Sequence, residues 1–316
     1  MKAAGEFDLI EFIRAQQQFA RPDVVLGIGD DAALLKPPAG YTMVMCSDTL
    51  NEGVHFPQGT DPEAVGWKAL AVNLSDLAAM GATPAWCLLN LCMPDPDARW
   101  LERFINGFFE LAAAHDVVLV GGDTTRGPLS ISVTACGFLP EGLALTRAGA
   151  QPGDDVWVSG TLGDAALALR RMLAREDLSA ELLDALDRPE PRLALGTALR
   201  GFASSCIDLS DGLLQDIGHI CAASGIAIQI DADVLPASAA FNACTEHGER
   251  LQLQSSGDDY ELCFSADPAY RSTLVSLAAQ LALPLTRIGT CEEGQGVTVL
   301  QNGVPVTTTH IGHVHF

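Results

Sequence analysis

Residues 117–123 read Val-Val-Leu-Val-Gly-Gly-Asp, an apolar run that stops abruptly at an aspartate. An unpaired carboxylate at the buried end of such a run costs several kcal/mol. Five endings of this kind favour carboxylates gathered around hard cations, which prefer oxygen ligands. The other four runs are 24–28 before Asp30 and Asp31, 43–46 before Asp48, 70–74 before Asp76, and 205–209, which contains Asp208 and precedes Asp211.

The order of apolar runs predicts an α/β (α+β) protein with mixed sheets. A length of 316 residues is typical of about two domains. A helix is expected over 62–80, with Asp61 as N-cap and Gly81 as C-cap. A second helix is expected over 98–114, where apolar residues recur at helical spacing. In the first half, strands are expected near 24–28, 42–47, 85–92, 117–121 and 129–138.

The pattern breaks at residues 149–154, Gly-Ala-Gln-Pro-Gly-Asp, a composition typical of a loop. We therefore expect domains at 1–148 and 149–316. In the second half, strands are expected at 156–159, 226–231, 261–265, 285–291 and 297–301. Helices are expected at 163–175 and 212–224, and a solvated acidic stretch at 176–190.

Charge and cysteine content narrow the possible partners. The net charge of −22 opposes binding to nucleic acid and anionic membranes. No apolar stretch has the roughly 18 residues that a bilayer span requires. The nine cysteines are scattered without any Cys-x-x-Cys pair, which predicts a reducing, cytoplasmic location rather than a disulfide framework or zinc site. Because the chain has only three lysines, any bound phosphate needs divalent metals to bridge it to the aspartates.

Residues 121–127, Gly-Gly-Asp-Thr-Thr-Arg-Gly, form the strongest single motif. Backbone N–H groups of a glycine-rich turn at Gly121 and Gly122 are suited to cradle phosphate oxygens. Asp123 is suited to hold a bridging metal, and Arg126 to add positive charge. The Walker A pattern occurs nowhere in the chain. Arg147 is a second phosphate-binding candidate, with a solvated arginine as the alternative.

Three other acidic motifs have both structural and functional interpretations. Residues 27–31, Gly-Ile-Gly-Asp-Asp, fit either a ligand-binding loop or a β-turn. Ser47 and Asp48 either provide hydroxyl and carboxylate ligands for magnesium or form a turn at the end of a strand. Asp76 lies in an apolar helix one turn after Asn73, so it needs a partner, and we favour a functional role over a solvated helix face.

The second half contains two further acidic segments. Residues 208–212, Asp-Leu-Ser-Asp-Gly, join a strand to a helix, where Ser210 or Asp211 is either an N-cap or part of an anion and cation site. Residues 256–261, taken alone, predict only a loop. No residue near His55 in the sequence indicates a functional role for it, so taken alone it is interpreted as a structural histidine.

Taken in order, these segments resemble the thiamine-monophosphate kinase family of the aminoimidazole ribonucleotide synthetase-like superfamily. That resemblance implies a two-domain fold, usually dimeric, in which N-terminal strands of two subunits close a barrel. It also implies transfer of the γ-phosphoryl of ATP to thiamine monophosphate. The matching stretches are 5–7, 27–32, 47–50, 53–56, 68–81, 121–129, 145–147, 152–154, 207–212 and 257–264.

The resemblance also implies roles for individual residues. Several magnesium ions would be held by Asp31, Ser47, Asp48, Asp76, Asp123, Asp208 and Asp211, with Cys46 contributing its backbone oxygen. Gly121, Gly122, Asp123, Arg147 and Ser210 would contact the nucleotide. His55 and Asp258 would contact thiamine phosphate, and His313 stands where relatives place an aromatic residue that stacks on thiamine, with Phe316 as the alternative.

We expect direct in-line transfer without a covalent enzyme intermediate, because the acceptor phosphate is already an anion. Asp48, Asp76 and Asp123 would act through the metals they hold. The alternative within the superfamily is another ATP-dependent synthetase. A non-enzymatic calcium-binding module is disfavoured because no EF-hand loop is present in the sequence.

Overall fold

The computed structural model describes residues 6–17, 20–95, 97–306 and 312. The chain divides into two compact units, Met1–Leu77 with Ala82–Gly142, and Ala78–Gly81 with Leu143–Phe316. Each unit is described separately below. The expected domain boundary near residue 148 stays a prediction. No helix in the described part of the chain is long and apolar enough to cross a membrane.

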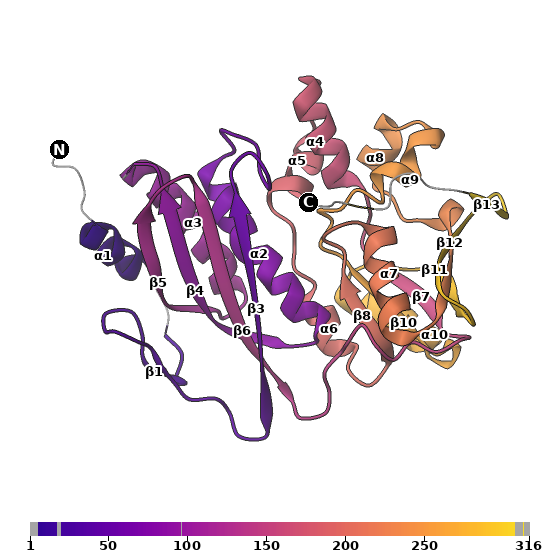
Figure 1. Cartoon of the computed structure of the whole chain (residues 1–316), viewed down its shortest axis with the longest axis horizontal. Helices are drawn as coiled ribbons and strands as arrows, with labels where there is room; N and C mark the ends of the chain where they lie inside the picture. The colour runs from indigo at the N-terminus through magenta and orange to yellow at the C-terminus, as the bar shows by residue number, and fades with distance from the viewer. Residues whose placement is uncertain (1–5, 18–19, 96, 307–311, 313–316) are drawn as a thin grey trace. The chain divides into compact units, whose positions relative to one another are not determined.

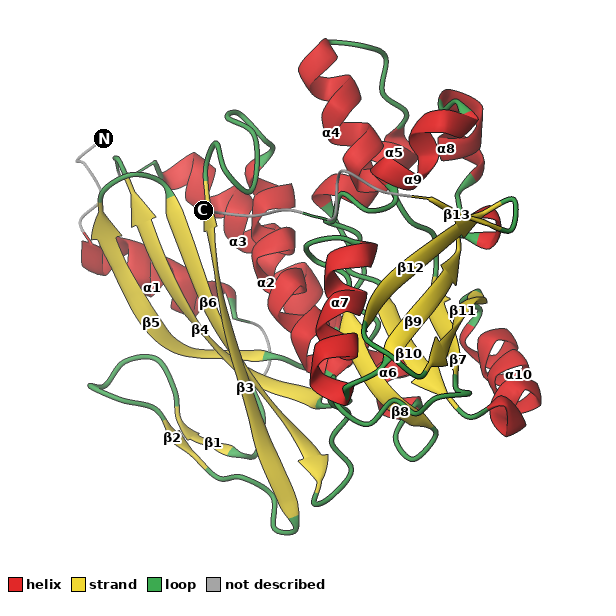
Figure 2. Ribbon diagram, turned by 45° about the vertical axis from the view of Figure 1, so that its right-hand side comes forward, coloured by secondary structure: helices red, strands yellow, loops and turns green. Residues whose placement is uncertain are grey.

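The first unit is built on a four-stranded sheet with the order β3-β6-β4-β5 (Figure 1). Its strands are β3 (Tyr41–Asn51), β6 (Ser130–Pro140), β4 (Thr83–Met93) and β5 (Val118–Arg126). Strand β6 pairs antiparallel with β3 and β4, whereas β4 and β5 are parallel. Helices α2 (Pro62–Ala79) and α3 (Ala98–Ala114) lie behind this sheet in Figure 2. The unit also contains α1 (Glu6–Gln16), β1 (Val24–Leu26) and β2 (Leu34–Leu35).

Both helices expected in the first unit are present. The carboxylate of Asp61 accepts from the Glu63 N–H at the start of α2, and Gly81 adopts φ +68° just after its end. The apolar stripe of α3 is core as expected, because Leu101, Phe104, Ile105, Phe108 and Leu111 are buried.

Two strands of the first unit run further than the sequence predicted. The polar pair Ser47 and Asp48 lies inside β3, and the Gly121–Arg126 motif lies inside β5. Neither forms a turn at a strand end, so the predicted glycine-rich turn at 121–127 is wrong. Polar residues are tolerated there because β3 and β5 are the edge strands of the sheet.

The second unit is built on a seven-stranded sheet with the order β13-β12-β9-β11-β7-β10-β8. Helix α7 (Leu213–Ser224) packs on this sheet through Leu213, Ile217 and Ile220. The strands are β7 (Asp155–Ser159), β8 (Ala203–Asp208), β9 (Ala227–Asp231), β10 (Leu262–Ala266), β11 (Leu285–Glu292), β12 (Gly296–Gln301) and β13 (Val304–Val306).

The acidic stretch 176–190 differs from the expected solvated segment. It contains α5 (Ala180–Asp187), which begins with a Ser179 cap and buries Leu182 and Leu186 in a cluster with residues of α4 (Asp164–Ala174). The two leucines lie four residues apart, and this i, i+4 spacing gives a short helix one apolar face. The remaining helical segments are α6 (Leu193–Ala198), η1 (Ala232–Val234), α8 (Ala239–Cys244), η2 (His247–Glu249), α9 (Arg250–Leu253), η3 (Pro268–Tyr270) and α10 (Arg271–Leu281).

Candidate active site

Asp48 of β3 and Asp76 of α2 form a pair of carboxylates in direct contact, which we call the acid pair. A side-chain hydrogen bond joins them. Between Lys68 and Ala79, Asp76 is the single residue that is not fully buried. Burial raises the pKa of Asp48, while the hydrogen bond to Asp76 and the charge of His55 act in the opposite direction. The acid pair therefore lies at an opening in an otherwise packed helix–sheet interface.

Two other predicted residues lie beside the acid pair. The Cys46 thiol donates to the Asn73 carbonyl at 3.2 Å. Burial, followed by the charges of Asp76 and Asp48, raises the pKa of this thiol, so it stays protonated and offers no thiolate ligand. The His55 Nδ1 accepts from the Asn51 N–H at 3.0 Å. That bond fixes the ring through Nδ1, and the charge of His55 also acts on Asp48.

Asp123 and Ser47 lie on the opposite sheet face from Asp48. Residues that pair directly on neighbouring strands point to the same face of the sheet. Asp48 pairs with Val133, Val133 with Leu89, and Leu89 with Gly122, so these four residues share one face. Asp123, the next residue along β5, therefore points to the other face, where it pairs with Asn90. Because side chains alternate along a strand, Ser47 also faces away from Asp48. Its hydroxyl bonds to Thr134 at 3.0 Å.

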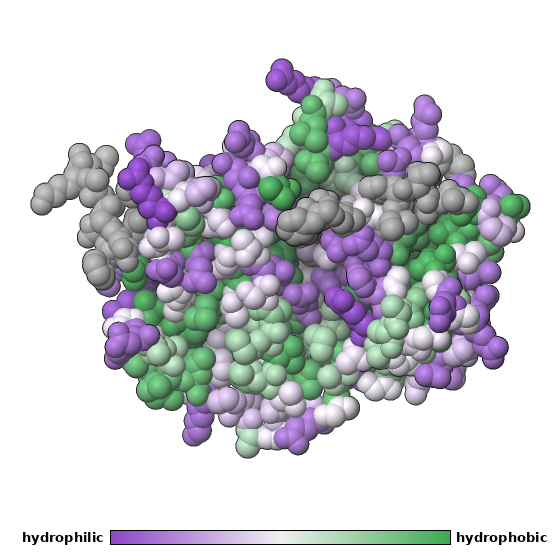
Figure 3. Space-filling model, viewed as in Figure 1, coloured by the Kyte–Doolittle hydropathy of each residue, from purple (hydrophilic) through white to green (hydrophobic). Residues whose placement is uncertain are grey.

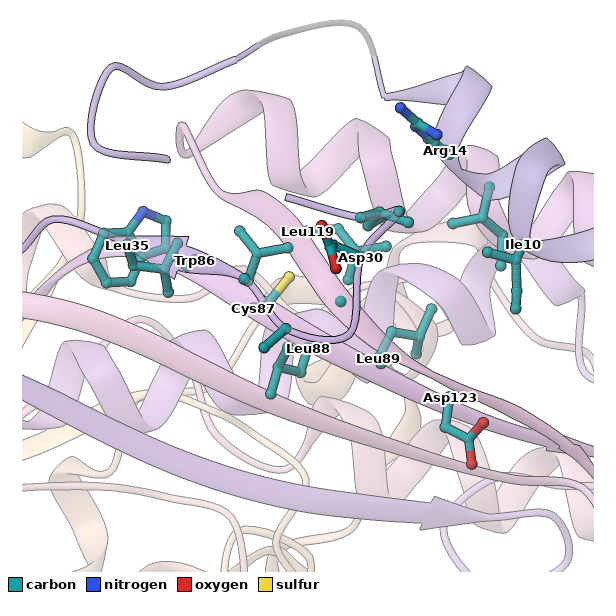
Figure 4. Close-up of a pocket in the computed structure, with 18 of the residues that line it drawn as sticks. Ile10, Arg14, Asp30, Leu35, Trp86, Cys87, Leu88, Leu89, Leu119 and Asp123 are labelled. Carbon is teal, nitrogen blue, oxygen red and sulfur yellow. The ribbon is translucent and has the colours of Figure 1, made fainter. Parts of the chain in front are cut away.

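A cavity of about 1080 Å³ lies on this second face of the sheet. Its charged lining includes Asp30, Asp31 and Asp123, together with Arg14 from α1. Figure 4 shows Arg14, Asp30 and Asp123 among the residues that line it, together with Leu88, which lies on the same sheet face as Asp123. The acids of residues 27–31 are thus placed with Asp123 and apart from the acid pair. Arg126, in contrast, is bound to Asp95 at 3.0 Å.

The first unit therefore holds two separate groups of acids. Asp48 and Asp123 lie on the two edge strands, three strand spacings apart, which is about 14 Å. One cation holds its oxygen ligands at about 2.0–2.6 Å, so these two carboxylates of one chain do not share an ion. Among the described residues, no group of three or more His, Cys, Asp or Glu side chains has the arrangement of a metal site.

In the second unit, Asp208 ends β8 and Asp211 precedes α7 as expected. The N-cap of α7 is Gly212 without a side-chain cap, so neither Ser210 nor Asp211 has that role. Instead, the Asp216 carboxylate accepts from the N–H groups of Asp211 and Gly212 at 3.2 and 3.0 Å. Burial raises the pKa of Asp216 to about 7, with further contributions from the nearby charges of Asp208 and Asp211.

Asp216 was missed by the sequence analysis. The sequence feature that could have indicated it is an acid in the first turn of a helix that follows Asp208 and Asp211. The carboxylate fixes the backbone of the loop that carries Asp211, which is a positioning task that the sequence alone did not separate from ordinary helix capping.

Arg147 and Ser210, both expected to contact the nucleotide, are held at opposite ends of α7. The Arg147 carbonyl accepts from the hydroxyl of Ser224, the last residue of the helix. Ser210 lies just before the helix, and its carbonyl accepts from the Asp258 N–H at 2.9 Å. A helix of 12 residues is about 18 Å long, so the backbones of these two residues lie far apart.

Asp258 and Gly312 both lie against the loop before α7. Asp258 has φ +68°, an unusual conformation for a residue with a side chain. Gly312 has φ +146°, and a Cβ there would lie 2.5 Å from the Gln215 side-chain oxygen and 3.0 Å from the Asp211 carbonyl. The close approach of residue 312 to this loop therefore requires glycine at that position. His313 and Phe316 lie outside the described residues.

Known proteins are similar to this chain in sequence and in fold. Residues 29–139 match the model of the AIR synthase related protein, N-terminal domain, and residues 151–301 match the C-terminal domain of the same family. A thiamine-monophosphate kinase of Salmonella typhimurium is 45% identical over 99% of both chains. The chain belongs to the thiamine-monophosphate kinase family.

Solved structures agree with the family assignment. A thiamine-monophosphate kinase from Stenotrophomonas maltophilia K279a is 52% identical, with a TM-score of 0.88 over 94% of this chain and 97% of that one. The structure of AaThiL complexed with AMPPCP and TMP is 32% identical, with a TM-score of 0.78 over 98% and 97%. The expected resemblance and the two-domain fold of this kinase family are confirmed.

Proposed function

We propose that this chain transfers the γ-phosphoryl group of ATP to thiamine monophosphate and so produces thiamine diphosphate. Its 45% identity over 99% of a thiamine-monophosphate kinase carries this proposal. The complex of AaThiL with AMPPCP and TMP supports the same pair of substrates. The acid pair adds a physical reason, because two carboxylates in contact at a partly open position are suited to a cation that carries phosphate.

The acid pair fits magnesium as a ligand set. Magnesium is usually bound by one or two carboxylates, substrate phosphates and water rather than by a cage of protein ligands. Two carboxyl groups that share a hydrogen bond in the absence of metal are the part of such a site that a chain supplies. Asp48 and Asp76 are the central proposed ligands. We extend this role to Asp31, Ser47, Asp123, Asp208 and Asp211, and to the backbone oxygen of Cys46.

The chain's own residues would orient two phosphate groups for in-line attack without a covalent intermediate. Bound magnesium would neutralise charge on both phosphates and so reduce their repulsion. Gly121, Gly122, Arg147 and Ser210 are the proposed nucleotide contacts. His55, whose Nδ1 accepts from the Asn51 N–H, is a proposed contact to the acceptor phosphate. Asp258 and His313 are the other proposed contacts to thiamine phosphate.

We also propose a homodimer in which the open face of the first unit's sheet packs against a second copy and the strands close a barrel. Met43, Met45 and Leu88 on this face are 46%, 57% and 37% exposed. Figure 3 shows apolar side chains gathered over the first unit. Exposed apolar side chains this close together are typical of an interaction surface.

Within the dimer, Asp123 is proposed to act with the acid pair of the other copy. The separation of about 14 Å within one chain supports this. Mixing inactive Asp48→Asn and Asp123→Asn chains tests it. If the two acids act across the dimer, each mixed dimer has one intact site and activity returns. If they act within one chain, every site carries one substitution and no activity returns.

The remaining proposals concern domains and location. We propose that residues 1–148 bind ATP and metal and form the dimer, and that 149–316 are a C-terminal α/β domain. All nine cysteines are free thiols, and Cys244 is the one that is exposed. Free thiols support a reducing compartment, and we propose the cytoplasm.

A turnover assay with ATP, magnesium and thiamine monophosphate tests the activity. The expected product is thiamine diphosphate, formed in equal amount with ADP. Phosphorylation of a carbonyl compound or of selenide, with thiamine monophosphate untouched, would instead identify a synthetase of the same superfamily. A phosphorylated enzyme trapped during turnover would contradict direct transfer.

A further inference from the structure

Asn73 is a fully buried polar residue of α2 that contacts Cys46 and Asp48, two of the β3 residues in the proposed magnesium site. It lies one turn before Asp76, so the two side chains leave the same face of the helix. The side chain has no solvent exposure. A buried amide needs partners for its donor and its acceptor, and here the partners come from two different elements.

The first contact fixes the backbone at Asp48. The Asp48 N–H donates to the Asn73 Oδ1 at 3.1 Å. Strand β3 is an edge of its sheet, and in an antiparallel pair alternate residues turn their backbone groups away from the partner strand. The Asp48 N–H therefore faces the open edge, where Asn73 takes the place of a neighbouring strand.

The second contact fixes the Asn73 side chain itself. Its Nδ2 donates to the Ala69 carbonyl, one turn earlier in α2, at 3.1 Å. Only one orientation of the amide satisfies this carbonyl and the Asp48 N–H together, because the reversed orientation would place two donors face to face. The acceptor oxygen is thus held toward β3.

The third contact joins the helix backbone to Cys46. The Cys46 thiol donates to the Asn73 carbonyl at 3.2 Å. Cys46 and Asp48 are two residues apart and so face the same edge and the same sheet side. Asn73 therefore holds both Cys46 and Asp48 of β3, next to the contact between Asp48 and Asp76.

We propose that Asn73 is a positioning residue that sets the distance between Asp48 and Asp76 and so the affinity for magnesium. This inference rests on the proposed function of the acid pair. Asn73 does not itself touch metal or substrate. Its removal would let β3 and α2 shift against each other, and the two carboxylates would no longer meet one cation at the same time.

The test compares Asn73→Leu with Ile105→Val in the full-length protein. Leucine has the same branching at Cγ but offers no acceptor to the Asp48 N–H. Ile105 is fully buried in α3, and its shortening controls for a general loss of stability. Manganese binding in the presence of AMPPCP is followed by the electron paramagnetic resonance of free Mn²⁺. The magnesium dependence of kinase activity is measured in parallel.

We expect Asn73→Leu to weaken manganese binding and raise the half-saturating magnesium concentration by about 10- to 100-fold. The KM for thiamine monophosphate at saturating magnesium should stay within about twofold, since uniform substrate binding is not altered. Ile105→Val should leave both metal measurements unchanged. If Asn73→Leu has the metal affinity of wild type, Asn73 has no positioning role.

Asp48→Asn separates failure of this inference from failure of the proposed function. If Asp48→Asn is inactive but Asn73→Leu behaves like Ile105→Val, the acid pair binds metal and the role of Asn73 is refuted. If Asp48→Asn keeps normal activity and manganese binding, the proposed function of the pair is itself refuted. If Asn73→Leu does not fold, Asn73→Ser is measured in the same way against the same control.

Discussion

Gly122 in β5 has almost no space for a side chain. A Cβ on this residue would lie 1.8 Å from the Leu89 carbonyl oxygen of the adjacent strand. Its φ of +145° is also one that residues with side chains rarely adopt. Gly122 thereby lets β5 stay close to β4 at the residue before Asp123, and this closeness determines where that carboxylate lies.

Replacing Gly122 by alanine should destabilise the fold. We expect Gly122→Ala to lower the free energy of unfolding by about 3 kcal/mol or more through backbone strain and overpacking, as measured by denaturant titration. Gly40→Ala is the matched control, because Gly40 has φ +79° but no atom within 4 Å of the new Cβ. The control should lose only about 1–2 kcal/mol. Equal losses in the two variants would contradict the close approach.

Neutralising one member of the acid pair should separate activity from stability. Asp48→Asn should lower kcat about 100-fold or more, since a proposed metal ligand for phosphoryl transfer is lost. Its Tm without magnesium should stay equal or rise, because burial disfavours the charge of Asp48. Scanning calorimetry and a turnover assay measure the two effects. A large fall in Tm would mean that the pair is structural.

Some residues of the site could be predicted from the sequence and others could not. Asp76 was predictable because a lone acid in an apolar helix needs a partner. Asn73 was noted as its neighbour, but its bond to Asp48 depends on which strand edge lies beside α2. Asp216 was missed because its partners are backbone groups of a loop, whose direction no spacing rule gives.

Among the elements of the second unit, β7, β11 and α10 are joined by a buried carboxylate. Asp155 is 1% exposed and accepts from two nitrogens of Arg271 at 2.5 and 2.7 Å. Arg287 adds one bond at 3.2 Å. The hydrogen bonds of Arg271, followed by the charges of both arginines, hold the pKa of Asp155 below its usual value of 3.8.

This arrangement predicts how stability changes with acid. A carboxyl with a lowered folded-state pKa adds stability above pH 3.8, and this stability is lost as the pH falls through the folded-state pKa. Arg271→Gln should therefore unfold at a higher pH than wild type and have a Tm at pH 7 lower by a few degrees. Arg287→Gln, which removes one longer bond, should have a smaller effect. If wild type and Arg271→Gln unfold at the same acidic pH, this prediction is contradicted.

Helices were easier to predict than strand ends. The helix over 98–114 followed from its apolar spacing and agrees with α3 residue for residue. Strands β3 and β5 ran past their polar residues, because an edge strand accepts side chains that a central strand would exclude. Helix α5 was missed because the many charged residues of this segment made its two apolar leucines, which pack on α4, look like part of a solvated stretch.

For the whole molecule, the open face of the first unit's sheet predicts the oligomeric state. Met45→Glu should raise the dimer dissociation constant by about 100-fold or more, because a charge in an apolar interface is strongly disfavoured. Sedimentation velocity measures the change. Leu173→Glu is the control, since Leu173 is an exposed apolar residue of the second unit, 72% accessible. A Met45→Glu protein that stays as dimeric as wild type would refute the interface.

The distribution of the acids over the first unit could not be predicted from the sequence. Each acidic motif was recognised, yet their relative positions depend on strand order and register, which bring together residues far apart in the chain. A single residue step in register exchanges the two sheet faces. The sequence therefore indicated candidate acids, whose roles stay predictions, and could not predict that Asp48 and Asp123 lie on opposite faces.

The burial of most thiols has a practical consequence for spectroscopy. Cys244 at the end of α8 is exposed, whereas the other eight cysteines are buried or half-buried. A maleimide fluorophore added in small excess should therefore label this one position without mutagenesis. The natural protein thus provides a specific attachment point for a dye, and its emission could follow nucleotide binding in real time.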